Sequence, residues 1–233
     1  MKYCKLCYLL LIASTSFVPN ESKDFKPKNY ATETVLKKVE VVYNSLDANS
    51  LSLPKLESFS QALEGFYQLK DSGKITSDCL TIIDFSLSSK TKRMWVIDLQ
   101  DHKVLFNSLV AHGKNSGDDY ATSFSNQNES YKSSLGFFAT AEVYTGTHGI
   151  SLKLDGLEKG VNDNARQRAI VIHGANYVCN DFIKNHNRLG RSQGCPALPI
   201  EMSNKIIQKI KGKSCLFIYH PSRNYNNNIK LVS

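Results

Sequence analysis

Hydrophobic positions in the first third of the chain recur at the spacing of an α-helix. From Thr32 onward, this spacing predicts one amphipathic helix. A second periodic stretch opens at Pro54 and ends near Gly73, where a glycine can terminate it. The positions that share a face are Val35, Val39, Val42, Tyr43 and Leu46 in the first stretch, and Phe59, Leu63, Phe66, Tyr67 and Leu69 in the second. We therefore expect a helical pair that packs against the rest of the chain.

After Ser77 the pattern changes to short runs rich in Ile, Val and aromatic residues, which are typical of β-strands. The predicted strands are Leu80–Phe85, Arg93–Leu99, Val104–Ala111, Leu135–Val143, Ile150–Leu154, Ala169–Ile172 and Cys215–Tyr219. A hairpin turn is expected at Asp101 and His102, and residues 113–129 form a long polar loop of the kind that often shapes a binding cleft. One further helix is predicted from Pro199 to Ile210, with Gly212 able to cap its end. The predicted fold class is α+β, with a β-rich domain preceded by the helical pair.

The N-terminal residues have the three parts of a secretory signal peptide. Lys2 and Lys5 precede an apolar run from Cys7 to Ala13, and small polar residues come after it. A membrane-spanning helix needs roughly 20 apolar residues, so this run is too short to span; a buried N-terminal helix is the less favoured alternative. We expect an exported protein of the periplasm or cell envelope, with no stable membrane insertion once the signal is removed. The predicted organisation is a signal peptide over 1–16, a linker over 17–30, a helical segment over 31–77, a catalytic domain over 78–221 and a polar tail over 222–233.

Composition narrows the possible partners only slightly. The 233 residues, 41% of them hydrophobic, favour one globular domain with appended segments. The net charge is +8, but the Lys and Arg residues are scattered along the chain and form no single run. A basic surface can attract any polyanion, and a merely solubilising surface would have the same composition. We predict no nucleic-acid partner.

Four cysteines are left after the predicted signal: Cys79, Cys179, Cys195 and Cys215. In an exported protein, disulfide bonds are the default expectation, but four cysteines also allow one reactive thiol to stay free. Cys195 has the setting for that role, because it lies in a small-residue loop, Ser192-Gln193-Gly194-Cys195-Pro196, just before the predicted helix. The positive end of a helix dipole would favour the thiolate there.

A histidine at the end of a buried strand can act on such a thiol. The apolar run Ile170–Ile172 ends at His173, where the chain turns on Gly174. An imidazole within hydrogen-bond reach of Cys195 would accept the thiol proton and later pass it to a leaving group. The backbone amides around Gly194 and Cys195 are candidates for stabilising an oxyanion.

These motifs resemble those of the L,D-transpeptidases of bacterial cell walls, which have the YkuD-type catalytic domain. The family's His-Gly pair and Ser/Thr-x-Gly-Cys motif correspond to His173-Gly174 and to residues 192–195, and residues 134–138 look like its substrate-side strand. The resemblance reaches back to about Asp78, two thirds of the chain, and is closest to a branch in which Gly-Arg-Ser-x-Gly-Cys-Pro-Ala is usual. In the better-known branch, a histidine replaces Gln193 and an Asn or Arg replaces Ala197, so substrate contacts of those side chains do not carry over.

The resemblance implies an L,D-transpeptidase that acts on peptidoglycan stem peptides. Cys195 would attack the carbonyl that precedes a terminal D-Ala, and His173, held by a backbone carbonyl near Gly174, would accept the thiol proton. A stem amine or water would then resolve the thioester, giving a crosslink, an exchanged terminal D-amino acid or a trimmed stem. No metal or organic cofactor is required. The predicted site consists of Cys195, His173, Gly174 and Gly194 for catalysis, and Ser134, Gly136, His148, Arg191, Ser192 and Gln193 for substrate binding. His148 and Arg191 are candidates from their place in the sequence and not from the resemblance, and Arg191 could equally be a surface residue of the loop.

Three other interpretations stay open. The side chains of His173, Cys179, His186 and Cys195 could gather a zinc ion, although their spacing matches none of the compact zinc-binding patterns. The same cysteine and histidine could serve an L,D-carboxypeptidase or cysteine peptidase with water as the acceptor. The third interpretation is a catalytically silent wall-binding module. The sequence leaves the roles of Arg166 and Arg168 open.

Overall fold

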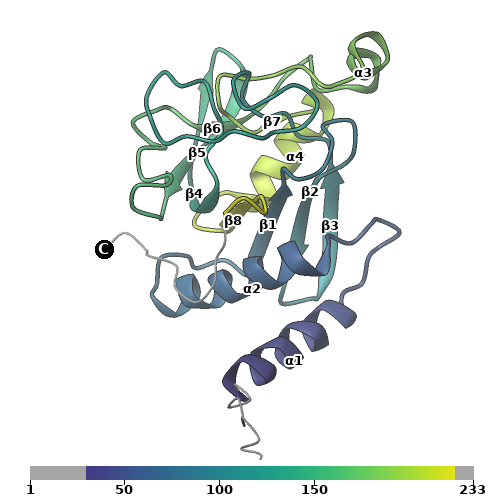
Figure 1. Ribbon diagram of the computed structural model, residues 1–233, viewed down its shortest axis with the longest axis vertical. Coiled ribbons are helices and arrows are strands. Elements are labelled where there is room, and N and C mark those ends of the chain that lie inside the picture. Colours follow the sequence, from purple (N-terminus) through teal and green to yellow (C-terminus); the bar gives the residue numbers. More distant parts are fainter. Residues whose placement is uncertain (1–29, 224–233) are drawn as a thin grey trace, which may run out of the picture.

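An eight-stranded sheet forms the centre of the computed structural model, which describes residues 30–223 and their side chains from Lys37 onward (Figure 1). The strand order is β3-β2-β1-β8-β4-β5-β6-β7. The strands are β1 (Cys79–Asp84), β2 (Met94–Asp98), β3 (Lys103–Ser108), β4 (Gly136–Gly146), β5 (Gly149–Gly156), β6 (Val171–Gly174), β7 (Ala197–Leu198) and β8 (Cys215–Tyr219). The pairs β1–β8 and β6–β7 are parallel, and the other neighbours are antiparallel.

Helices cover both faces of the central strands. The helices of the described residues are α1 (Tyr30–Asn44), α2 (Leu56–Asp71), α3 (Asn180–His186) and α4 (Ile200–Ile210). On one face, Phe59 and Phe66 of α2 share a core with Leu80 of β1, and α1 lies outside α2 (Figure 1). On the other face, Ile206 and Ile210 of α4 pack in a second core. Strands β1 and β8 are buried along their whole length because apolar side chains are covered on both sides.

The structure confirms the α+β class, the helical pair and all seven predicted strands, with ends that shift by a few residues. The helix before the C-terminus is also confirmed, and Gly212 comes after its last residues with the positive φ of +77° that a helix end favours. Two elements were not predicted, namely α3 and the two-residue strand β7. The predicted signal peptide and most of the polar tail lie outside the described residues. Within residues 30–223, no helix has both the length and the apolar character to cross a membrane.

The four described cysteines are all free thiols. Cys79 and Cys215 lie in neighbouring strands, because Leu80 is the register partner of Cys215. Successive side chains of a strand point to opposite faces, so Cys215 faces the core beneath α2 and Cys79 faces the core beneath α4. A disulfide between them would require the backbone to move, since their Cβ atoms lie on opposite sides of the sheet.

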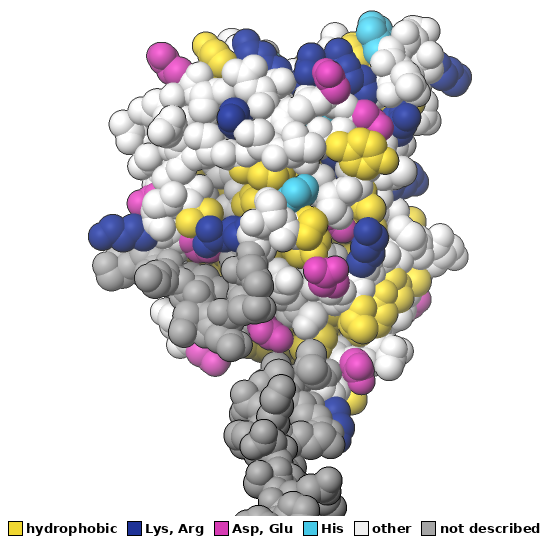
Figure 2. Space-filling model, viewed as in Figure 1, with side chains coloured by type: hydrophobic (Ala, Val, Ile, Leu, Met, Phe, Trp, Pro, Cys, Tyr) yellow, Lys and Arg dark blue, Asp and Glu magenta, His cyan; other side chains and the backbone are white. Residues whose placement is uncertain are grey.

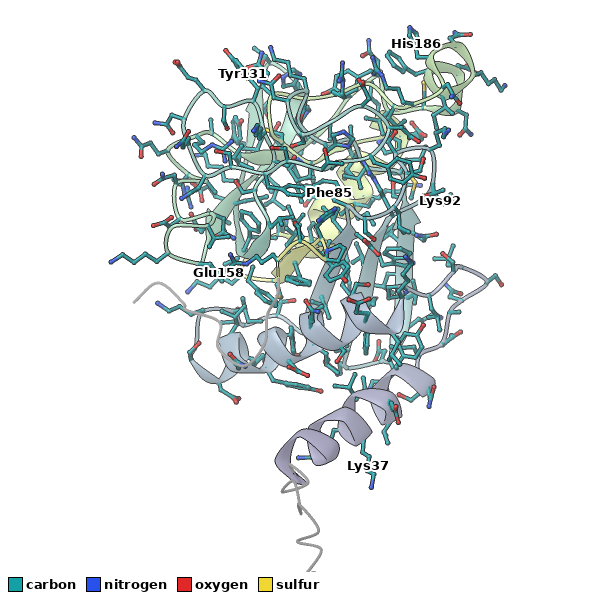
Figure 3. All side chains as sticks on the ribbon, in the orientation of Figure 1. Lys37, Phe85, Lys92, Tyr131, Glu158 and His186 are labelled. Carbon is teal, nitrogen blue, oxygen red and sulfur yellow. The ribbon has the colours of Figure 1, made fainter. Side chains whose placement is uncertain are left out.

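Long loops gather at the end of the molecule farthest from α1. Figure 3 places Tyr131 of the loop over 113–135 at this end and Lys37 of α1 at the opposite end. On the face seen in Figure 2, basic and acidic side chains are interspersed with uncharged surface. The loop-covered end is therefore built on the sheet and its two large apolar cores.

Candidate active site

The edge of the sheet at β6 and β7 brings His173 and the Cys195 loop together. His173 is the third residue of β6, and its partner in the parallel strand β7 is Ala197. Cys195 precedes that partner by two residues, and the N–H of Val171 in β6 donates a hydrogen bond to the Cys195 Sγ atom at 3.4 Å. Thus one short strand holds the histidine and also contacts the sulfur of the cysteine.

The ring of His173 is oriented by the backbone. Its side chain is 3% exposed, and the Nδ1–H group donates to the Gly174 carbonyl oxygen over 2.9 Å. A carbonyl can only accept, so this contact assigns the proton of the neutral ring to Nδ1 and leaves Nε2 as a proton acceptor. Burial lowers the pKa of His173, and the Gly174 hydrogen bond opposes that decrease. The charge of neighbouring His148 lowers the pKa further. The lowered pKa favours the neutral form of the ring that a general base requires.

Cys195 lies in a setting that differs from the one its sequence predicts. Residues Ala197 and Leu198 form β7, and α4 begins only at Ile200, so the thiol is not at a helix N-terminus. The helix dipole therefore does not act on the sulfur, and the expectation of a thiolate stabilised in this way was wrong. Burial raises the pKa of the Cys195 thiol, while the Val171 N–H and the positive charge of Arg168 oppose that rise.

The loop before Cys195 is fixed by its own serine. The Ser192 Oγ atom accepts the Gly194 N–H over 3.0 Å and donates to the Cys195 carbonyl over 2.6 Å. Of the two amides expected to face an oxyanion, that of Gly194 is thus already bound. Among the hydrogen bonds of the described residues, the Cys195 N–H has no acceptor, so it is the amide available to a ligand.

Gly194 also allows the polar loop to approach closely. Its φ is +126°, and a Cβ atom there would lie 2.9 Å from the Lys132 carbonyl oxygen. Ser133 ties the two loops together, because its Oγ donates to the Gly194 carbonyl over 3.1 Å and accepts the Gly113 N–H over 3.0 Å. Only glycine fits at position 194 without displacing the neighbouring backbone.

Arg168 links this polar loop to the neighbourhood of the sulfur. Its guanidinium donates to the carbonyl oxygens of Ser125 (2.8 Å) and Lys132 (2.7 Å), and to the hydroxyl groups of Ser130 and Ser134. Burial raises the pKa of Cys195 overall, and the positive charge of Arg168 opposes that rise, so it favours a thiolate at the sulfur. The sequence left this residue without a role, and the structure gives it two.

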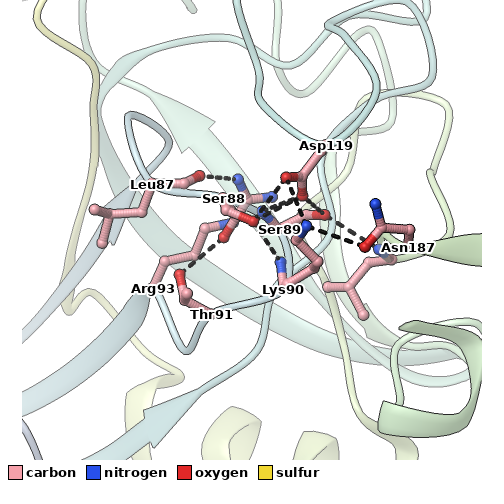
Figure 4. A network of polar contacts seen from close by, with 9 residues as sticks. Leu87, Ser88, Ser89, Lys90, Thr91, Arg93, Asp119 and Asn187 are labelled. Carbon is pink, nitrogen blue, oxygen red and sulfur yellow. Dashed lines mark hydrogen bonds and ion pairs between the residues drawn. The ribbon is translucent and has the colours of Figure 1, made fainter. Parts of the chain in front are cut away.

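A second network fixes the polar loop from its other side. The Asp119 carboxylate accepts hydrogen bonds from both Ser88 and Ser89 (Figure 4). The Ser89 Oγ atom in turn accepts the Leu189 N–H over 3.1 Å. Lys90 joins the network through its ion pair with Asp119 at 3.5 Å. Three segments that are distant in sequence are thereby joined beside the site.

A pocket of about 570 Å³ opens over Cys195 and His173. Of the residues predicted for the site, those that line it are Cys195, His173, His148, Arg191, Ser192 and Gln193. The remaining lining residues are Glu129, Tyr131, Tyr144, Arg168, Ala169, Val171 and Tyr177. Among the described side chains, no hydrogen bond joins the sulfur to the imidazole; the thiol instead donates to the Ala169 carbonyl, 3.7 Å away. The two groups thus share a pocket, and the polar contacts of the sulfur are with the Val171 N–H and the Ala169 carbonyl and not with the imidazole.

Several predicted residues lie outside this pocket. Ser134 is buried and donates to the Ser125 carbonyl, and Gly136 is packed so that a Cβ atom would lie 2.2 Å from the Glu158 carboxylate. Gly194 and Gly174 act through backbone geometry and do not line it, although Gly174 borders a neighbouring hollow. The Arg191 guanidinium, although in the pocket wall, pairs with Asp118 at 2.7 Å.

The four side chains that could have gathered a zinc ion do not meet. Cys179 accepts the Phe182 N–H at the start of α3, and the His186 ring stacks on the Phe182 ring with centroids 4.0 Å apart. Neither residue lines the pocket of Cys195. Within residues 30–223, no three His, Cys, Asp or Glu side chains are grouped closely enough to hold a metal ion.

Fold and pocket together define a catalytic domain with a thiol and an imidazole at one sheet edge. Residues 51–219 match the family described as the L,D-transpeptidase catalytic domain, and the chain belongs to that family. A comparison with curated proteins finds no match.

Solved structures similar to this chain include several L,D-transpeptidases. The enzyme from Mycobacterium smegmatis is 11% identical with a TM-score of 0.40, and the match covers 62% of this chain and 59% of that one. The helical cell shape determining protein Pgp2 from Campylobacter jejuni is 15% identical with a TM-score of 0.38, over 64% of this chain and 53% of that one. The enzyme from Xylanimonas cellulosilytica is 13% identical with a TM-score of 0.35, over 80% of this chain and 93% of that one. The chain spans about three fifths of the length of the first of these structures.

Proposed function

We propose that this protein is an exported cysteine L,D-transpeptidase that acts on peptidoglycan stem peptides through a thioester at Cys195. The observation that carries the proposal is the shared pocket of Cys195 and His173 within a domain of the L,D-transpeptidase family. The neutral His173 ring and the available Cys195 N–H support it further. Export rests on the signal-like residues at the N-terminus.

In the first half of the reaction, the Cys195 sulfur attacks the carbonyl carbon that precedes the terminal D-Ala. The thiol proton passes to Nε2 of His173, and the Cys195 N–H donates a hydrogen bond to the oxyanion. The C–N bond then breaks, D-Ala leaves with the proton from His173, and the acyl group stays on the sulfur.

In the second half, an amine of a neighbouring stem attacks the thioester. His173 removes the amine proton, the C–S bond breaks, and the sulfur takes the proton back. A D-amino acid in place of the stem amine gives an exchanged terminus, and water gives a trimmed stem. The last outcome is the L,D-carboxypeptidase alternative, which uses the same acyl-enzyme.

The test is incubation of the full chain with purified tetrapeptide stems, followed by mass analysis of protein and products. We expect the wild type to gain the acyl mass on Cys195 and to release D-Ala. Cys195→Ala should gain no such mass, and His173→Ala should acylate about 10²- to 10⁴-fold more slowly, the usual cost of losing a positioned base. Cys179→Ser is the matched control, because Cys179 caps the start of α3 outside the pocket.

The products separate the alternatives. Crosslinked dimers or exchanged termini support transpeptidation, whereas trimmed stems alone support the carboxypeptidase. An unmodified wild-type protein with every stem and with a carbapenem would contradict the proposal and favour a silent wall-binding module.

A further inference from the structure

An exposed histidine contacts the buried imidazole of the site. His148 lies in the turn between β4 and β5, and its ring stacks on the His173 ring, with centroids 4.4 Å apart and planes inclined by 23°. Stacked aromatic rings attract each other beyond the effect of the area they bury. The turn therefore places a flat group directly on the face of the base.

This contact supplies a restraint that the neighbouring strands do not. The partners of His173 in the sheet are Ser151 of β5 and Ala197 of β7, and neither has a ring. The hydrogen bond from Nδ1 to the Gly174 carbonyl fixes one edge of the imidazole, but a single hydrogen bond does not by itself define the plane of the ring. Stacking against His148 restrains that tilt.

The same ring separates two hollows. His148 lines the pocket of Cys195, and it also lines a second hollow of about 550 Å³. Other residues around the second hollow include Thr147, Ile150, Asn176, Ile200 and Ser203. Without the His148 ring, the imidazole would lose part of the wall between it and the solvent of this second hollow.

We propose that His148 is a positioning residue for His173: its ring holds the imidazole in the plane that directs Nε2 into the pocket. The inference rests on the proposed function for the role of His173 as the base. Stacking needs a flat ring and no titratable nitrogen. Phenylalanine should therefore replace His148 in this role, and alanine should not.

The test measures the reactivity of the Cys195 thiol in the full chain, with and without substrate. We expect His148→Ala to slow both the alkylation of Cys195 by iodoacetamide at pH 7 and its acylation by a tetrapeptide stem. The loss should be about three- to ten-fold, the factor that corresponds to one aromatic pair. In turnover, kcat should fall while KM stays unchanged, and His148→Phe should restore the wild-type rates. Alkylation is read by mass analysis of the peptide that contains Cys195.

His186→Ala is the matched control, because this variant also removes an exposed histidine stacked on a ring, but on α3 outside the pocket. It should react at the wild-type rate. A readout specific to the base is the NMR signal of the His173 Nδ1 proton, which should be sharp in the wild type and His148→Phe and broadened in His148→Ala.

Wild-type rates in His148→Ala would overturn the proposal, as would a His148→Phe variant as slow as His148→Ala. Alkylation requires no peptide substrate. If the alkylation rates follow the predicted order and no stem is acylated, the proposed function fails while the contact between His148 and His173 keeps its role.

Discussion

Replacing Arg168 with methionine tests whether one side chain both orders the polar loop and stabilises a thiolate at Cys195. Methionine keeps most of the length of the stem and removes every donor. The carbonyl oxygens of Ser125 and Lys132 would each lose a charged partner. A polar group left unsatisfied in a buried position costs about 1–3 kcal/mol. The Ser125 carbonyl keeps the Ser134 hydroxyl as a donor, so among the described residues the Lys132 carbonyl is the one left without a partner. Because Arg168 is only half-buried, we take the lower part of that range and expect a loss of about 1–2 kcal/mol in the free energy of unfolding.

The effect on the thiol has a defined sign. The charge of Arg168 lowers the pKa of Cys195 against the larger effect of burial, so Arg168→Met should raise that pKa. The thiolate is the species that reacts with iodoacetamide, and its fraction at a given pH falls as the pKa rises. The curve of alkylation rate against pH should therefore move to higher pH.

Arg168→Lys separates the two roles. Lysine keeps the positive charge but lacks the planar fork of donors that reaches several acceptors at once. We expect Arg168→Lys to lose stability in denaturant unfolding, with a smaller displacement of the alkylation curve than Arg168→Met. An alkylation curve of Arg168→Met that coincides with the wild-type curve would refute the electrostatic role, and unchanged unfolding of both variants would refute the role in the loop.

Three further predictions concern buried residues at this end of the molecule. His112 is 1% exposed, accepts a hydrogen bond from Arg93 and has its pKa lowered to about 4, first by burial and then by the charge of Arg93. Between about pH 6.5 and 4 the unfolded chain binds a proton at His112 and the folded chain does not, so the free energy of unfolding should fall by about 2 kcal/mol from pH 7 to pH 5. Denaturant unfolding at the two pH values measures this fall, and an equal fall in His112→Gln would contradict the prediction. Burial and the charge of His148 lower the pKa of His173, and the Gly174 hydrogen bond only partly offsets them, so the acylation rate should fall with acidification only below pH 6.5. A fall that begins above pH 6.5 in stopped-flow measurements would contradict a buried neutral base. Gly194→Ala places a Cβ atom 2.9 Å from the Lys132 carbonyl oxygen at φ +126°, so we expect acylation to slow and the free energy of unfolding to fall by about 1–3 kcal/mol. Wild-type unfolding together with wild-type acylation would show that the loop shifts freely to accept the methyl group.

The elements that sequence predicted well are those whose burial leaves a pattern. Strands β1 and β8 are covered on both faces, so they consist of unbroken apolar runs, and α2 has a regular apolar face. Helix α3 buries none of its seven residues, and β7 has only two residues, so neither has a periodic pattern to detect. Local sequence therefore records packing on the core and not these short segments at the surface.

The residues of the site also fall into those that local sequence predicts and those that only the tertiary fold reveals. His173 was predicted because it ends an apolar strand, and Cys195 because of its small-residue loop. Arg168 was not predicted, since its role depends on where the polar loop passes, and only the tertiary fold brings Ser125 and Lys132 to it. The supposed helix dipole at Cys195 was wrong because β7 intervenes, and a two-residue strand leaves no signal in the sequence.

Burial changes the pKa values of both reacting groups in the directions that favour their neutral forms. It raises the pKa of the Cys195 thiol and lowers the pKa of the His173 imidazole, so both changes favour the neutral pair over the thiolate–imidazolium pair. The thiol–Ala169 contact agrees with this, because a carbonyl accepts a proton that a thiolate would not have. During acylation the S–H bond must therefore break and its proton pass from Sγ to Nε2 of His173, while the Val171 N–H and the charge of Arg168 stabilise the sulfur as it becomes negative. On this account the base must be correctly oriented at the moment when a substrate is bound, and a flat ring stacked on His173 affects the rate of chemistry more than the affinity for the stem.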